Sequence, residues 1–267
     1  MLTDTCQRWE LGRESRRPAG EVIRPSEYEV GPIGPVEAKA FVELHHYSGS
    51  CSPTAHPFGL WRRGEHVGTA VFGPLPSMNA HRAVFGGLTT KQAVTLGRLV
   101  LLDNVPGNGE SYFVARCFEL LRSRGIAAVE SCADPEPCTS SDGHRVRPGH
   151  VGTVYQALNG RFIGRTNRAS LRVLPDGSVL SNRTQGKVHR SERGQSTAYA
   201  QLEAFGATPI ATGEDPGEWL VRWRNQLTRT MRHHGNYRYI WALDRRRRRD
   251  IVERFEALPY PKIGLAA

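Results

Sequence analysis

Apolar residues recur at helical spacing in two stretches of the chain. In Pro35–Tyr47 a proline is followed by apolar residues three or four positions apart, which is typical of a helix that begins at the proline. Glu110–Arg124 carries a broader apolar face and is followed by Gly125, a residue common at helix C-termini. Both stretches are therefore predicted as amphipathic helices.

The apolar runs between and after these helices predict strands. Phe58–Pro74 is predicted as a β-hairpin that turns at Arg63-Gly64, and Ala93–Asp103 and Ile126–Cys132 as further strands. The resulting order, three strands, a helix and a strand, favours α/β layers with at least one parallel pair of strands. The fold class that we predict is α/β (α+β), with a mixed central sheet flanked by helices.

The second half of the chain is more polar. We expect an exposed excursion at Pro135–Pro148 and a hairpin turn at Pro175-Asp176-Gly177. The other predicted elements are a short helix in Gly149–Asn159, helices at Ser196–Phe205 and Glu218–Met231, a strand at Tyr237–Leu243 and a last helix from Asp244. Three parts follow: an extended lead-in at 1–34, an α/β domain at 35–180 that includes the excursion 135–148, and a basic, aromatic-rich extension at 181–267.

The composition argues against a disordered, membrane-spanning, secreted or disulfide-linked protein. The chain has 267 residues, of which 39% are hydrophobic and 23% charged, so it can bury a core. No apolar run approaches the roughly 20 residues of a membrane span. Residues 1–24 are polar and Arg-rich rather than a signal sequence, and five scattered cysteines do not form a disulfide framework. We expect a cytoplasmic protein without membrane contact.

The positive charge is confined to one region. Residues 1–160 hold 16 basic and 16 acidic side chains, whereas residues 161–267 hold 20 and 10, which accounts for the net charge of +10. This asymmetry favours double-stranded DNA as a partner. The arginines assigned to DNA contact are Arg238, Arg245, Arg246, Arg247, Arg248 and Arg249. The alternative is a solvated helix face.

The segment Asn104–Ser111 joins a predicted strand to a predicted helix and contains two glycines. The backbone N–H groups of such a loop and the helix N-terminus can hold a pyrophosphate, although a plain turn has the same composition. The spacing resembles the acyl-CoA loop of GNAT acetyltransferases, which implies acetyl-CoA or a related acyl donor. The residues expected to bind it are Val100, Gly107, Asn108 and Gly109.

Two polar positions lie among apolar neighbours. Period-two alternation places Arg98 on one strand face with Leu96 and Val100, where it either meets a carboxylate or phosphate or holds its head group in solvent. His46, followed by Tyr47, ends the first predicted helix. It acts there as an acid, base or ligand, or it is held as a cation by the helix C-terminus.

Cysteine and histidine residues recur at equal intervals in one segment. They are Cys132, Cys138, His144 and His150. Sulfur and imidazole suit zinc, but the spacing matches no usual zinc finger. The metal is therefore left unassigned, with these four residues as its candidate ligands.

Several short motifs accompany these residues. They are Ser131-Cys132-Ala133-Asp134, the run Gly-His-Val-Gly-Thr-Val-Tyr-Gln-Ala at 149–157, Gly109-Glu110-Ser111 and the pair His46-Tyr47. In this combination the chain resembles the Mom family of phage DNA-modification proteins over roughly residues 35–165. In that family the first motif leads almost directly into the second, whereas here Pro135–Pro148 is inserted between them.

The resemblance implies a GNAT-like fold and an enzyme that converts adenine N6 in DNA to a carbamoylmethyl (acetamido) adenine, which protects phage DNA from host restriction. Because adenine N6 is buried in the duplex, base flipping is expected. The catalytic residues that the resemblance implies are His46, Tyr47, Arg98, Ser111, Asp134 and Tyr155.

Two other classes stay open. One is a GNAT N-acetyltransferase of a small amine or protein, whose substrate does not require the basic extension. The other is a non-catalytic DNA-binding protein, in which the polar residues Arg98, Ser111 and Asp134 have no explanation.

Overall fold

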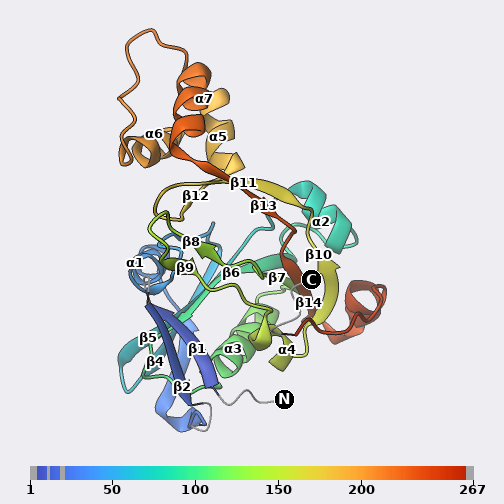
Figure 1. The fold of residues 1–267 in the computed structure, drawn as a ribbon. Coiled ribbons are helices and arrows are strands. Elements are labelled where there is room, and N and C mark those ends of the chain that lie inside the picture. The colour runs from blue at the N-terminus through green and yellow to red at the C-terminus, as the bar shows by residue number, and fades with distance from the viewer. Residues whose placement is uncertain (1–4, 11–12, 19–21, 263–267) are drawn as a thin grey trace. The chain divides into compact units, whose positions relative to one another are not determined.

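A computed structural model describes residues 5–10, 13–18 and 22–262 of the chain, the first two segments by their backbone (Figure 1). The chain divides into two compact units. Unit 1 comprises the chain up to Pro135, His150–Arg165 and the chain from Asn236 onward, and unit 2 comprises Glu136–Gly149 and Thr166–Gly235. None of the described helices combines the length and the apolar character that a bilayer span requires.

Unit 1 is built on a seven-stranded sheet in the order β10-β14-β7-β6-β5-β4-β3. All neighbouring strands are antiparallel except β6 and β7, which are parallel. The strands are β3 (Tyr28–Pro32), β4 (His56–Arg62), β5 (Glu65–Gly73), β6 (Ala93–Leu101), β7 (Ala128–Ala133), β10 (Arg161–Arg165) and β14 (Tyr237–Ala242). A separate hairpin pairs β1 (Thr5–Glu10) with β2 (Arg13–Pro18). The predicted mixed sheet with one parallel pair is confirmed.

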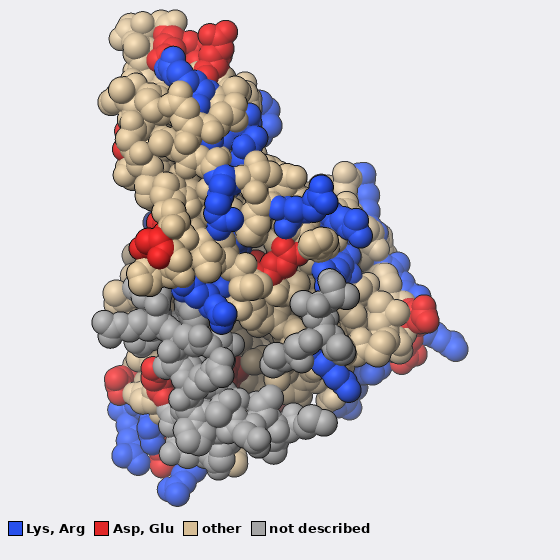
Figure 2. All heavy atoms as spheres, in the orientation of Figure 1, with Lys and Arg blue, Asp and Glu red and all other residues tan. Residues whose placement is uncertain are grey.

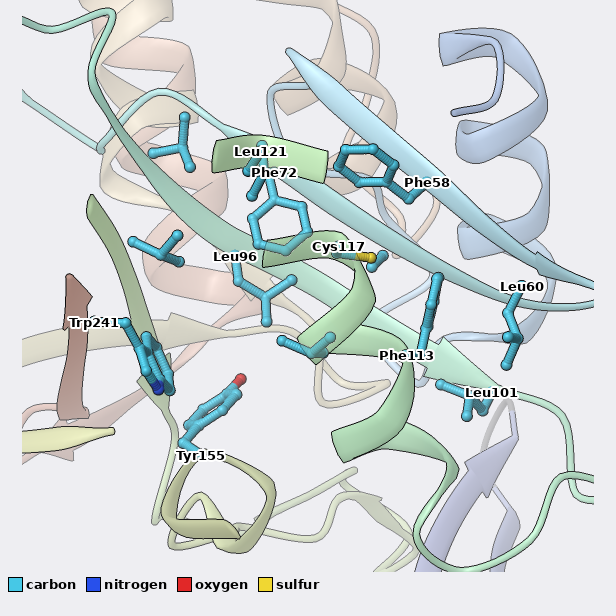
Figure 3. Packing of buried hydrophobic residues seen from close by; sticks show 14 of the residues in the cluster. Phe58, Leu60, Phe72, Leu96, Leu101, Phe113, Cys117, Leu121, Tyr155 and Trp241 are labelled. Atoms are coloured by element: carbon cyan, nitrogen blue, oxygen red, sulfur yellow. The ribbon is translucent and has the colours of Figure 1, made fainter. Parts of the chain in front are cut away.

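One face of the sheet carries the main core of unit 1. The helices α3 (Gly109–Ser123) and α4 (Thr153–Ala157) cover this face. Figure 3 shows side chains of the sheet and of α3 packed together; those labelled are Phe58, Leu60, Phe72, Leu96, Leu101, Phe113, Cys117 and Leu121. The apolar face that predicted α3 is thus the face that packs on the sheet.

The opposite face of the sheet is covered at two places. The helix α1 (Pro35–His45) packs there on Val71 and Val100. The helix α2 (Met78–Phe85) packs on Ala128 and Ile240 together with the last turns of the chain, η2 (Arg245–Arg247) and η3 (Arg249–Glu253). The sheet is therefore buried on both faces.

Unit 2 has its own core. The strands β11 (Ala169–Val173), β12 (Val179–Leu180) and β13 (Arg229–His233) form a sheet in the order β12-β11-β13, and β8 (Cys138–Thr139) pairs with β9 (Arg145–Arg147). Three helices enclose a cluster around Trp219: α5 (Asn182–His189), α6 (Ser196–Glu203) and α7 (Pro216–Leu227). Asp215 caps α7 by accepting a hydrogen bond from Glu218 N (2.8 Å), with Pro216 in the first turn.

Unit 2 consists of two insertions into unit 1. The first leaves after Pro135 and returns at His150, and His150 N donates to Asp134 O (2.7 Å) next to both points. The second lies between Arg165 and Tyr237, which face each other as paired residues of β10 and β14. Both insertions therefore leave and re-enter unit 1 at residues that are neighbours in space.

Several elements differ from the sequence predictions. The lead-in and the extension supply strands to the central sheet, β3 and β14, because the side chains of Tyr28, Tyr239 and Trp241 complete its core. The segment Pro135–Pro148 is not simply exposed, since it forms β8 and β9 and buries Cys138. The single helix predicted at Glu218–Met231 is wrong: α7 ends at Leu227, and the chain then pairs with β11 as β13.

Candidate active site

The parallel strands β6 and β7 separate in the middle of the sheet. They pair over four residues, from Ala93 opposite Ala128 to Leu96 opposite Ser131. At the last pair Ser131 Oγ donates to Leu96 O (3.0 Å). Beyond it, no described strand pairs with the edge of β6 that faces β7. The sheet is thus open between the C-terminal ends of its two central strands.

Arg98 lies on β6 just past this separation, next to a β-bulge at Gly97. The bulge reverses the alternation, so Leu96 packs in the core under α3 while Val100 packs under α1. The prediction that Leu96, Arg98 and Val100 share one face is therefore wrong. A Cβ at Gly97 would lie 2.4 Å from Ser52 Oγ, which explains a glycine here.

The Arg98 guanidinium is held by neutral acceptors. It donates to Ser50 O (2.7 Å), Gly97 O (2.7 Å) and Ser50 Oγ (3.3 Å), and no carboxylate of the described residues forms an ion pair with it. Burial lowers the pKa of Arg98, although the nearby Tyr47 and Tyr155 raise it. A half-buried guanidinium without a carboxylate suits an anionic group on a substrate.

His46 is buried at the C-terminus of α1, with 8% of its surface exposed. Burial, reinforced by Arg98 and His150, lowers the pKa of His46 to about 3. Its Nδ1 accepts a hydrogen bond from Ser48 N (3.1 Å), which leaves the neutral ring's proton on Nε2. The interpretation of His46 as a cation held by the helix end is therefore wrong, because desolvation outweighs the helix dipole.

Tyr155 of α4 approaches the same opening from the core side. Its ring packs against Tyr239 and Trp241, as Figure 3 shows for Trp241. Burial raises the pKa of Tyr155, and a hydrogen bond with Ser131 lowers it by a smaller amount. The phenol is therefore protonated at neutral pH. Ser131 was not singled out as a site residue, although a hydroxyl in a buried strand is a signal for such a role.

Asp134 ends β7, and its backbone bond to His150 brings the two halves of the interrupted motif together. The Asp134 carboxylate raises the pKa of His150, whereas burial, the larger effect, lowers it. His150 in turn stands over the Tyr155 ring at 6.3 Å between ring centroids. The insertion therefore leaves Asp134 close to the Gly-His motif.

Five of the six predicted catalytic residues are linked in this way. The His46 ring packs tilted against Tyr47 (4.2 Å between centroids). The other links are electrostatic: Arg98 acts on His46, Tyr155 acts on Arg98, and His150 acts on His46 and is acted on by Asp134. Ser111, the sixth, lies in the first turn of α3, where its hydroxyl donates to Asn108 O (3.0 Å). Among the described residues, Ser111 is not part of this chain of interactions.

The residues predicted to bind a cofactor lie on the loop before α3 and on β6. Val100 is buried under α1, and the Asn108 side chain accepts a hydrogen bond from Ile23 N (2.8 Å). A Cβ at Gly109 would lie 2.4 Å from Val105 Cγ1. Gly109 is thus required for packing, while Gly107 and Asn108 form the approach to the N-terminus of α3.

The four candidate metal ligands are not gathered at one place. Cys138 and His144 belong to unit 2, where Cys138 is buried and the His144 side chain is 83% exposed. Burial and Glu130 raise the pKa of Cys132 to about 12. In the part of the chain that the structure describes, no group of three or more His, Cys, Asp and Glu side chains is arranged to hold a metal ion.

The predicted DNA-contacting arginines fall into two groups. Arg238 pairs with the buried Glu130 (2.9 Å) on the sheet, and Arg247 donates to Gly87 O (2.7 Å) after α2. Arg248 pairs with Glu253 (3.2 Å) at the surface. The exposed members without such a partner in the described chain are Arg245, Arg246 and Arg249. Figure 2 shows basic side chains over much of the visible face.

Fold and site together define an α/β protein whose mixed sheet opens between two parallel strands onto a cluster of His, Tyr, Arg and Asp side chains. The chain belongs to the Mom protein family, whose family profile matches residues 27–262. It is 24% identical over 229 residues to the methylcarbamoylase Mom of Escherichia phage Mu, covering 84% of this chain and 80% of that protein.

Solved structures of acetyltransferases are among those to which the chain is similar. A tandem GNAT protein from the clavulanic acid biosynthesis pathway is 9% identical, with 82% of this chain and 99% of that chain covered and a TM-score of 0.42. A Bacillus subtilis acetyltransferase in complex with CoA is 11% identical, with 81% and 97% covered and a TM-score of 0.34.

Proposed function

We propose that this protein is a DNA-modification enzyme that attaches a carbamoylmethyl group to adenine N6 and thereby protects the DNA from restriction. The proposal rests on one observation: in a member of the Mom family, five implied catalytic residues lie together where β6 and β7 separate. The family relative from phage Mu is named a methylcarbamoylase.

The chemistry of these side chains suits such a transfer. The bond between adenine N6 and the methylene carbon forms as the bond from that carbon to the donor's leaving group breaks, the leaving group departs with the electron pair, and N6 loses a proton. The carboxylate of Asp134 is the acceptor we assign to that proton. Arg98 stabilises negative charge on the transferred group, since its guanidinium has no carboxylate partner among the described residues. Tyr155 stays protonated and donates a hydrogen bond or a proton.

His46 has a different part in this proposal. With a pKa of about 3 it is neutral at physiological pH, and its Nε2–H is a hydrogen-bond donor rather than a base. The ring of Tyr47 packs tilted against it, and we assign Tyr47 to the wall of the adenine pocket. Ser111, at the N-terminus of α3, is assigned to the donor of the transferred group.

An acyl-CoA-type donor fits the residues present. The edge of β6 from Gly97 to Leu101 has no strand partner toward β7 in the described chain, so it can bond an extended amide-containing arm. The N-terminus of α3 follows and favours phosphate. A carbamoylmethyl group is bonded to N6 through its methylene carbon, so acyl transfer alone would not give this product. The donor held here would have to supply a –CH2–CONH2 group bonded to a leaving group, and a CoA-type carrier would be bound through its amides and phosphates.

The test is mass spectrometry of nucleosides from DNA of cells that express the protein. The expected product is a deoxyadenosine heavier by an acetamide substituent. Asp134→Asn removes the proton acceptor with little change in shape and is expected to abolish the product. Asp142→Asn, an exposed aspartate of unit 2, is the matched control and keeps it. Unmodified deoxyadenosine with the folded wild-type protein contradicts the proposal.

A further inference from the structure

The strands β11 and β13 of unit 2 form an antiparallel ribbon with two different faces. The third strand of this sheet, β12, pairs with β11 only at Arg172 and Val173. Five consecutive residues pair, from Ala169 opposite His233 to Val173 opposite Arg229. Because side chains alternate along a strand, one face carries Leu171 and Met231. The other face carries two polar cross-strand pairs: Ser170 opposite Arg232 and Arg172 opposite Thr230.

The polar face of the ribbon is the open one. Ser170, Thr230 and Arg232 are exposed, and Arg172 is half-buried. On the other face Val173 and His233 are buried. Arg229, which shares that face, donates to Thr139 O (2.7 Å) of the hairpin β8–β9, so the hairpin lies on the apolar side.

The arginines on this face are not neutralised. Arg172, Arg232 and the exposed Arg168 form no ion pair with a carboxylate of the described residues. Elsewhere in unit 2, by contrast, Arg190 pairs with Glu192 and Arg222 pairs with Glu214. The open face thus combines uncompensated guanidinium groups with hydroxyls, a set that donates hydrogen bonds to anionic oxygens.

We propose that this face, made of Arg168, Ser170, Arg172, Thr230 and Arg232 and called here the ribbon face, binds duplex DNA in its major groove. The major groove admits a two-stranded β-ribbon, and from Ala169 to Leu171 no other described strand pairs with β11 or β13. Five residues at about 3.3 Å each extend about 17 Å, the length of about five base pairs. Arginine forks match phosphate and guanine, and hydroxyls bond to either. This inference rests on the proposed function and identifies how the DNA substrate is held.

The experiment compares two double variants that each remove two positive charges from unit 2. Arg172→Gln with Arg232→Gln alters the ribbon face, and Arg190→Gln with Arg222→Gln is the matched control. Fluorescence anisotropy with a 20-base-pair duplex is measured from 50 to 200 mM KCl. If both ribbon arginines touch phosphates, the log–log slope falls by about 1.8, so the variant loses about 12-fold less affinity over this range than wild type. The control keeps the wild-type slope.

Duplex RNA of the same sequence separates groove binding from a general attraction to polyanions. The major groove of an A-form helix is too narrow for a ribbon, so the ribbon variant and wild type are expected to bind RNA with equal slopes. An equal change on RNA and DNA overturns the proposal, as does a ribbon variant that behaves like the control on DNA. Arg168→Gln lies outside the paired strand, and a slope lowered by about 0.9 confirms the result without risk to the sheet.

The DNA-binding measurement tests the ribbon face separately from adenine modification at the site between β6 and β7. A wild-type protein that shows the expected slopes but leaves adenine unmodified contradicts the proposed function and supports the ribbon face. A protein that modifies adenine and shows no difference between the two double variants retains the function and refutes the ribbon face.

Discussion

The buried neutral histidine at the end of α1 makes folding stability depend on pH. His46 has a pKa of about 3 in the folded chain because burial disfavours its charged form, against about 6.5 for an unfolded chain. As pH falls below 6.5 the unfolded state takes up a proton that the folded state does not, so stability is lost toward pH 3. Between pH 7 and pH 5 the loss from this residue is about 2 kcal/mol.

The variant that tests this loss is His46→Asn, whose side-chain oxygen can still accept from Ser48 N. The free energy of unfolding is measured by urea titration at pH 7 and pH 5 for wild type, for this variant and for His144→Asn, whose side chain is 83% exposed. Wild type is expected to lose about 2 kcal/mol more than His46→Asn between the two pH values, and His144→Asn to behave as wild type. Equal losses in all three proteins refute the buried neutral state of His46.

Three substitutions test other parts of the structure. Arg98→Lys keeps the charge but cannot reproduce the contacts to Ser50 and Gly97, so the yield of modified adenine is expected to fall about 100-fold with the melting temperature unchanged. Arg247→Gln removes the bond to Gly87 O and is expected to lower stability by about 1 kcal/mol in urea without changing the salt dependence of DNA binding, whereas Arg245→Gln lowers the log–log slope by about 0.9. Gly109→Ala places a Cβ 2.4 Å from Val105 Cγ1 and is expected to cost about 1–3 kcal/mol of unfolding free energy.

Local patterns predicted the elements whose apolar faces pack on the central sheet. The stretches that became α1, α3 and the hairpin β4–β5 carry their own periodicity, and the structure confirms them. The helix α2 was missed because contacts distant in sequence stabilise it: Arg254, about 170 residues later, donates to Val84 O at its C-terminal end. The helix α5 buries little more than Gln185 and Val188, too few positions for a recognisable period.

In the candidate site, too, the local sequence predicted some features, while others depend on contacts distant in sequence. The motifs indicated which residues to consider, but the side on which Arg98 points depends on a bulge that its own strand does not reveal. The neutral state of His46 depends on how deeply the end of α1 is buried and on Arg98, 52 positions away in the chain. Burial and register are long-range properties, so a period-two or helix-dipole argument from the local sequence gave the wrong result for both residues.

The insertion between Asp134 and the Gly-His motif illustrates why spacing along a chain is a weak guide to geometry. Fifteen residues separate Asp134 from His150, yet one hydrogen bond of 2.7 Å joins their backbones. The intervening segment folds into unit 2, where it forms β8 and β9 and buries Cys138. An insertion that begins and ends at hydrogen-bonded neighbours leaves the residues on either side of it adjacent, whatever its length. The ribbon face lies in the second insertion, Thr166–Gly235, which joins this segment in unit 2, while Asp134, His150 and Tyr155 all belong to unit 1.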